Sequence, residues 1–114
     1  MNMDDWRIVC CRLMYFFHFV QCEDGVLAVE AVKASMSALS PYDCILMDEV
    51  MPNMNGSMAT ALIREMGYRG TVVSVTGNVL PEDKALIMSR GADYLLSKPL
   101  KVKDLEKMLF PNDR

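Results

Sequence analysis

Two apolar patterns alternate along this chain between residues 25 and 110, and this alternation constrains the fold more than any other feature. Short, nearly continuous apolar runs at 42–47 and 71–75 are typical of strands that are buried on both faces. Elsewhere, apolar residues recur three or four positions apart, which is the period of an amphipathic helix. Strands that alternate with helices predict a parallel sheet with helices on both faces.

Turn residues mark where these elements begin and end. Pro81, followed by Glu82 and Asp83, predicts a helix start, because proline needs no partner for its nitrogen there and carboxylates favour the positive end of a helix. The helix that follows Gly25 is expected to end before Pro41. The helix that starts at Pro81 is expected to end at Gly91. The other expected elements are a helix after Gly56 that ends at Gly67 or Gly70, a strand at 94–96 and a last helix from 102 to 109.

The first quarter of the chain has two interpretations. Residues 7–17 form either an apolar helix that leads into a strand at 18–22, or the first arm of a hairpin. The helix is favoured because the run lacks the regular alternation of a half-buried strand.

Composition restricts the class of protein. A chain of 114 residues with 52% apolar and 24% charged residues is typical of one globular domain with its own core. Its net charge of -3 gives no indication of a basic surface for nucleic acid or membrane. The apolar stretch at 8–20 is too short to span a bilayer, and Arg12 and His18 interrupt it.

The cysteine and histidine positions favour a reducing compartment, the cytoplasm or the nucleus. Cys10, Cys11, Cys22 and Cys44 all lie in apolar runs without a Cys-x-x-Cys pair, so they are interpreted as buried thiols. The only histidine, His18, lies among phenylalanines and is interpreted as structural, because metal sites gather several donors.

Three polar residues follow the expected strands directly: Asp48, Thr76 and Lys98. The carboxyl ends of parallel strands meet at one edge of a sheet, so these side chains are expected to converge. A carboxylate, a hydroxyl and an ammonium together could hold a tetrahedral anion, with the carboxylate as nucleophile and the cation offsetting negative charge. Periodicity alone leaves a second interpretation open, in which the three residues are caps and solvated surface groups.

The local sequences around these residues resemble the receiver domain of two-component response regulators. The resemblance is continuous over 23–110, within a single receiver domain at 1–114, and looks most like receivers attached to hybrid histidine kinases. It implies a flavodoxin-like, doubly wound parallel sheet, (βα)5, with strand order 2-1-3-4-5. The motifs that carry it lie at 46–56, 75–78, 91–93 and 97–99.

The resemblance implies a role for each matching residue. Asp48 is the phosphoacceptor, which takes a phosphoryl group from a phosphohistidine on a histidine kinase or a histidine phosphotransfer protein. Thr76 is the switch hydroxyl and Lys98 the counter-ion, aimed by a cis bond to Pro99. Gly77 leaves the approach to the phosphoryl group open. The remaining implied role is a backbone carbonyl that Val50 offers to a metal.

The implied metal is Mg²⁺, which receivers bind with an acidic pair at the end of the first strand. Asp4 and Asp5 are the only candidates, but three residues precede them and a buried strand needs about five. If residues 7–9 match the middle of the family's first helix instead, the acidic pair lies upstream of Met1. This second alignment is favoured. It predicts that the first strand is short or missing, and makes Mg²⁺ binding conditional on an acidic pair.

The resemblance favours a switch module rather than a metabolic enzyme. A degenerate receiver that serves as a protein interaction module without phosphorylation is the alternative. No direct contact with nucleic acid or membrane is expected, and a homodimer could form through the fold's fourth helix and fifth strand, here the helix after Pro81 and the strand at 94–96. Glu49 is expected to face solvent.

Overall fold

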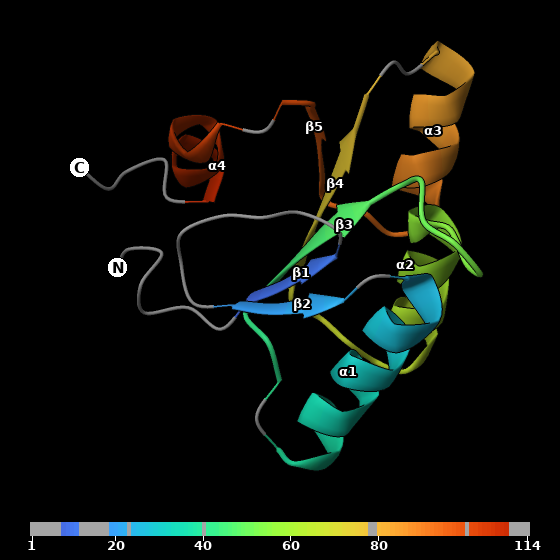
Figure 1. The fold of residues 1–114 in the computed structure, drawn as a ribbon, viewed down its shortest axis with the longest axis vertical. Coiled ribbons are helices and arrows are strands. Elements are labelled where there is room, and N and C mark those ends of the chain that lie inside the picture. The colour runs from blue at the N-terminus through green and yellow to red at the C-terminus, as the bar shows by residue number, and fades with distance from the viewer. Residues whose placement is uncertain are drawn as a thin grey trace.

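A computed structural model describes residues 8–11, 19–22, 24–39, 41–77, 80–99 and 101–109 (Figure 1). These residues form five strands and four helices. In chain order they are β1 (Ile8–Cys11), β2 (Phe19–Cys22), α1 (Gly25–Ser37), β3 (Cys44–Asp48), α2 (Gly56–Glu65), β4 (Thr71–Thr76), α3 (Pro81–Ser89), β5 (Tyr94–Ser97) and α4 (Val102–Leu109).

The strands form one sheet in the order β2-β1-β3-β4-β5, and every neighbouring pair is parallel. This is the predicted order. The chain moves outward from β1 to β2 and then crosses back to β3, so the direction of winding reverses between β1 and β3. Ligand sites of such sheets lie at the carboxyl ends of the strands near this reversal.

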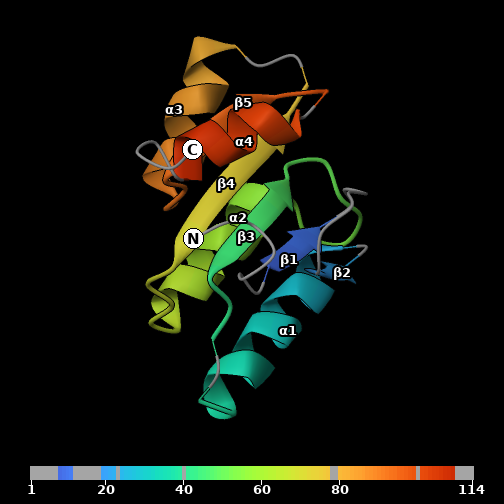
Figure 2. The same ribbon diagram turned by 90° about the vertical axis from the view of Figure 1, so that its left-hand side faces the viewer.

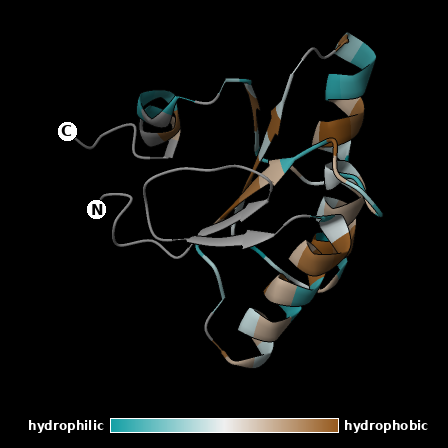
Figure 3. Ribbon diagram, viewed as in Figure 1, coloured by the Kyte–Doolittle hydropathy of each residue, from teal (hydrophilic) through white to brown (hydrophobic). Residues whose placement is uncertain are grey.

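Helices cover the two faces of the sheet unequally. Figure 1 shows α1, α2 and α3 on one side and α4 on the other. Seen from the α4 side in Figure 2, α4 lies in front of β4 and β5. The hydrophobic colours in Figure 3 run along β3 and β4. The core between these strands and the helices α1 and α2 contains Ala28, Val32, Ile45, Met47, Ala59, Ile63 and Val72.

The first quarter of the chain differs from the prediction. The favoured helix at 7–17 is wrong, because Ile8–Cys11 is a strand between β2 and β3. A first strand is therefore present, and it is short, at 4 residues. Central strands of parallel sheets are commonly apolar at consecutive positions, without alternation. The absence of alternation therefore did not distinguish this strand from a helix.

The segment in which the predicted (βα)5 pattern places its first helix, between β1 and β2, lies outside the described residues. The described helices follow β2, β3, β4 and β5, as that pattern predicts for the rest of the chain. The structural interpretation of His18 lies outside the described residues.

The other predicted boundaries are confirmed. Helix α3 begins with Pro81 in its first turn, and Glu82 and Asp83 lie in that turn. Gly91 follows the helix with a φ of 118°, a conformation that favours glycine. Within the part of the chain that the structure covers, no helix has the length and apolar character needed to cross a membrane.

Candidate functional site

The three polar residues predicted to converge lie at the carboxyl ends of three adjacent strands. Asp48 is the last residue of β3, Thr76 the last of β4, and Lys98 follows the last residue of β5. In the register, Asp48 is paired with Val75 and Thr76 with Ser97. The three residues therefore occupy one short stretch of the sheet edge.

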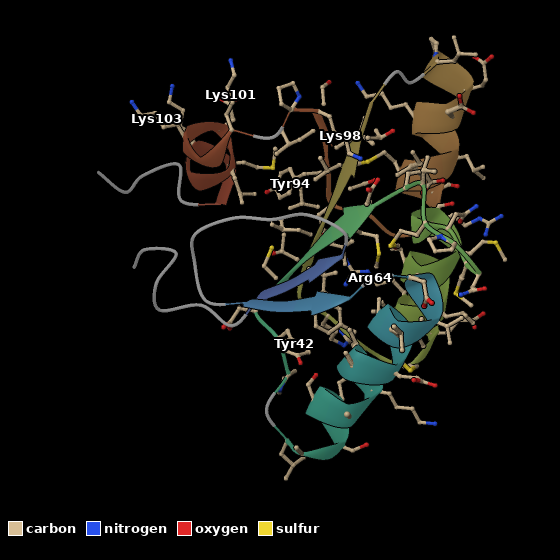
Figure 4. The ribbon with its side chains drawn as sticks, viewed as in Figure 1. Tyr42, Arg64, Tyr94, Lys98, Lys101 and Lys103 are labelled. Atoms are coloured by element: carbon tan, nitrogen blue, oxygen red, sulfur yellow. The ribbon has the colours of Figure 1, made fainter. Side chains whose placement is uncertain are left out.

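The Asp48 carboxylate is buried and paired. Its side chain is 6% exposed, and its Oδ2 accepts a hydrogen bond of 2.9 Å from Lys98 Nζ. Its Oδ1 accepts a longer bond of 3.3 Å from the Val50 N–H. Figure 4 shows Lys98 directed back over the sheet, whereas Lys101 and Lys103 point away from it. The Asp48 carboxylate is therefore largely shielded from water, whereas its ammonium partner on Lys98 is 40% exposed.

Neighbouring backbone leaves room beside this pair. Thr76 is 7% exposed, and its carbonyl accepts a hydrogen bond of 2.8 Å from the Lys98 N–H, which ties the end of β4 to the lysine. The peptide bond between Lys98 and Pro99 is cis, as the resemblance implies. A Cβ at Gly77 would meet no heavy atom within 4 Å, so the approach to the sheet edge is open at this residue.

A family model, the response regulator receiver domain, matches residues 7–110. The chain belongs to this family. Receiver domains are the signal-receiving modules of two-component systems, so the resemblance stated from the motifs is confirmed, and with it the α/β fold class.

Relatives of this receiver occur in response regulators and in hybrid kinases. The two-component response regulator ORR41 of Oryza sativa subsp. japonica is 40% identical over 89 residues, which make up 78% of this chain and 68% of the rice protein. The sensor histidine kinase RcsC of Salmonella typhi is 36% identical over 89 residues, again 78% of this chain but 9% of the kinase. This receiver therefore spans a small part of that kinase.

A solved receiver domain has the same fold. The receiver domain of the sensor histidine kinase PA1611 from Pseudomonas aeruginosa PAO1 is 26% identical, with a TM-score of 0.75 over 91% of this chain and 93% of that one. Its crystal structure contains a magnesium ion coordinated in the active site cleft.

The sequence predicts that Glu49 faces solvent, and the structure shows that this prediction is wrong. Glu49 is half-buried, and its carboxylate accepts hydrogen bonds from the Ser57 N–H at 2.7 Å and from Ser57 Oγ at 3.1 Å. Ser57 lies in the first turn of α2, where backbone N–H groups lack partners within the helix. A carboxylate eight positions before an expected helix start is too common a pattern to have predicted this contact.

Asp24 is a second residue whose role was not predicted. Its Oδ1 accepts a bond of 2.8 Å from the Leu27 N–H and so caps α1, while its Oδ2 accepts one of 2.8 Å from the Asn53 side chain. These two bonds, the Leu27 bond first, lower the pKa of the Asp24 carboxyl below its ordinary value. An aspartate before the glycine that opens a helical pattern is a known capping signal and could have been read as one. The contact ties α1 to the loop that follows Asp48.

The described residues do not fit a magnesium centre of the expected kind. Asp48 supplies one carboxylate, and no group of three or more His, Cys, Asp or Glu in the described ranges could hold a metal ion. The backbone carbonyl of Val50 stays a ligand implied by the resemblance. Asp4 and Asp5 lie outside the described residues and precede β1, whereas the expected acidic pair follows the first strand. The next residues after β1 in the sequence are Arg12 and Leu13. The described site therefore contains a single carboxylate and a single ammonium.

Proposed function

We propose that this receiver is a phosphoacceptor module that takes a phosphoryl group on Asp48 from a phosphohistidine of a histidine kinase or histidine phosphotransfer protein. The observation that carries the proposal is the buried Asp48 carboxylate with Lys98 Nζ 2.9 Å from its Oδ2, at the open edge of a parallel sheet. A nucleophile needs both access to the donor and a cation close to the charge that develops in the transition state.

The proposed transfer has simple atom balance. A lone pair of an Asp48 carboxylate oxygen forms the new O–P bond while the N–P bond of the phosphohistidine breaks, and its electron pair stays on the imidazole nitrogen. Lys98 offsets charge on the phosphoryl oxygens, because an ammonium about 4 Å from one negative charge contributes about 4 kcal/mol at a surface-like dielectric. Thr76, 7% exposed at the end of β4, is the proposed hydroxyl donor to a phosphoryl oxygen.

The module is proposed to have no metabolic substrate, so its chemistry is limited to its own phosphorylation and dephosphorylation. The second candidate is a degenerate receiver that binds partners without phosphorylation. The single carboxylate of the described site favours this second candidate. The two functions differ in one measurable property, a covalent phosphate on Asp48.

Incubation with acetyl phosphate tests the proposal. We expect an acid-labile, base-labile phosphate on Asp48, found by intact mass and then localised after reduction with borohydride. Trapping the phosphate on another residue, or finding none after incubation with either acetyl phosphate or a phosphorylated histidine phosphotransfer protein, would exclude the phosphoacceptor function and leave the interaction module.

Mg²⁺ is expected to have little effect on this site. One carboxylate and one carbonyl replace few of the waters that Mg²⁺ gives up reluctantly, and Lys98 already neutralises that carboxylate. We expect the amide resonances of Asp48 and Val50 to shift without saturation up to about 10 mM MgCl₂. NaCl at matched ionic strength is the control. Saturation below about 1 mM would show that the chain completes a metal site.

Two finer proposals concern location and assembly. The cysteine positions support the cytoplasm, or alternatively the nucleus, and compartment-specific labelling tests this. Exposed apolar residues on α3 and β5 support a homodimer through that face, and sedimentation velocity of the phosphorylated chain tests it. These residues are Leu86, Met88 and Tyr94, which are 47%, 38% and 40% exposed.

A further inference from the structure

Glu49 connects the phosphoacceptor strand to the first turn of α2 through three hydrogen bonds. Its carboxylate binds the N–H and the Oγ of Ser57, and its backbone carbonyl accepts a bond of 3.0 Å from the Gly56 N–H. Ser57 is 4% exposed, so this contact is largely shielded from water. Glu49 therefore satisfies the first two unpaired N–H groups of the helix at once.

The peptide between Glu49 and Val50 lies between this helix and Asp48. Its carbonyl accepts from Gly56, and its N–H donates to Asp48 Oδ1 at 3.3 Å. A peptide unit is planar, so a rotation that breaks one of these bonds also misdirects the other. The position of α2 thus sets the direction of an N–H that contacts the phosphoacceptor.

The contact between α2 and Asp48 is too close for the helix to shift independently. A Cβ at Gly56 would lie 2.3 Å from the Asp48 carbonyl oxygen and 2.9 Å from Met47 Cγ. The backbone of the first helical turn therefore packs directly on the peptide of the phosphoacceptor. Displacement of this turn moves the carbonyl of Asp48 as well as the Glu49–Val50 peptide.

The position of Glu49 also bears on charge at the site. It follows Asp48 directly, so a freely moving carboxylate would add negative charge close to the group that must accept a phosphoryl anion. Both carboxylate oxygens are instead held by Ser57 at the helix start, where the backbone N–H groups carry partial positive charge. The two hydrogen bonds from Ser57 direct the Glu49 carboxylate toward the start of α2.

We propose that Glu49 is a positioning residue for Asp48, acting through the Ser57 contact and the Glu49–Val50 peptide. The expected effect of Glu49 on the rate of phosphoryl transfer rests on the proposed phosphoacceptor function. Its expected effect on the Val50 N–H rests on the geometry alone. Glu49 touches no reacting atom, so its loss should slow transfer without removing it.

Replacing Glu49 by alanine is expected to slow acetyl phosphate labelling of Asp48 by about 10-fold, because small misplacement of a reacting group has large rate effects. The same change is expected to speed hydrogen exchange of the Val50 amide by about 10-fold. In Glu49→Gln, the labelling rate of Asp48 and the exchange rate of the Val50 amide should both lie within about 3-fold of those of the original chain, because the glutamine amide oxygen still accepts from the Ser57 N–H.

Asn55→Ala is the matched control. Asn55 Oδ1 caps the same helix by accepting a bond of 2.9 Å from the Met58 N–H, and it also accepts one of 3.1 Å from Ser57 Oγ. Its removal leaves both bonds from Ser57 to the Glu49 carboxylate in place. Asn55→Ala should lower the melting temperature about as much as Glu49→Ala does. It should change the labelling rate of Asp48 and the exchange rate of the Val50 amide by less than about 2-fold. Equal slowing by Asn55→Ala and Glu49→Ala would overturn the positioning role and leave general helix stability as the cause.

Two further measurements keep the outcomes separate. If Glu49→Ala fails to fold, Ser57→Ala removes the bonds from Oγ to Glu49 and Asn55 but keeps the bond from the Ser57 N–H to Glu49, and it should slow labelling by about 3-fold. If the original chain is not labelled at all, the proposed function fails, yet faster Val50 exchange in Glu49→Ala still supports the positioning role. Unchanged Val50 exchange in a folded Glu49→Ala chain contradicts it.

Discussion

Asp48→Asn is expected to abolish the acid-labile phosphate and to leave the chain folded. The amide nitrogen of asparagine is not a nucleophile for phosphorus, and the amide oxygen is a far weaker one than a carboxylate oxygen. We expect labelling by acetyl phosphate to fall by more than about 100-fold, the fraction of phosphorylated chain being measured by intact mass.

The fold should tolerate this change because asparagine has nearly the shape of aspartate. Its amide oxygen can still accept from Lys98 Nζ, while the loss of a charge at a site only 6% exposed removes a desolvation cost. The melting temperature should therefore change by only a few degrees.

Asp83→Asn is the matched control, since Asp83 is exposed in the first turn of α3. It should be labelled to the same extent as the original chain. Equal labelling of Asp48→Asn would move the phosphoacceptor to another residue.

The site was predictable from the sequence where a buried strand ends abruptly in a polar residue. The run at 44–47 is apolar throughout and is followed by Asp48, and 72–75 is followed in the same way by Thr76. All four residues from Cys44 to Met47 are buried, so the pattern reports burial on both faces directly. Parallel packing then brings the strand ends together without further information.

The first quarter of the chain and the loop after Asp48 were less predictable, for different reasons. Residues 8–20 are apolar at nearly every position, so the period that separates helix from strand is absent. In the loop, the bonds between Glu49 and Ser57 and between Asp24 and Asn53 join residues 8 and 29 positions apart. Such contacts depend on how the elements pack, which no local pattern records. Each of them fixes the backbone next to the phosphoacceptor.

Arg64 is the basis of the second large prediction, which concerns stability rather than chemistry. From the end of α2, its guanidinium donates to the carbonyls of Gly91 at 3.0 Å, Tyr68 at 3.0 Å and Gly70 at 2.8 Å. A fourth bond of 2.8 Å joins it to the Asp93 carboxylate. One side chain thus connects α2 to the turn before β4 and to the segment between α3 and β5.

Backbone packing around this side chain leaves little room for a substitute. A Cβ at Gly91 would lie 2.6 Å from Arg64 Cγ, and the guanidinium carbon lies 5.6 Å from the centre of the Tyr68 ring. Burial raises the pKa of the Tyr68 hydroxyl, which donates to the Tyr42 carbonyl at 2.9 Å. The arginine therefore supports a region that contains several buried polar groups.

Arg64→Ala is expected to lower the free energy of unfolding by about 3 kcal/mol, because it leaves several partly buried carbonyls without a donor. The ion pair between Arg64 and Asp93 contributes little to this loss of stability, because the Asp93 side chain is 46% exposed and the Arg64 side chain 23% exposed. A change of this size is more than about a 100-fold shift in the unfolding equilibrium. The midpoint of urea denaturation measures it.

Two substitutions test whether the bonds to the carbonyls cause the loss. Arg64→Lys keeps the charge but lacks the planar fork that reaches several acceptors at once, so it should recover only about 1 kcal/mol. Arg69→Ala removes an exposed arginine from the same turn and should change stability by less than about 0.5 kcal/mol. Because these carbonyls lie near the amino ends of β4 and β5, the labelling rate of Asp48 per folded molecule should not change. Full recovery in Arg64→Lys would instead assign the stability to the ion pair with Asp93.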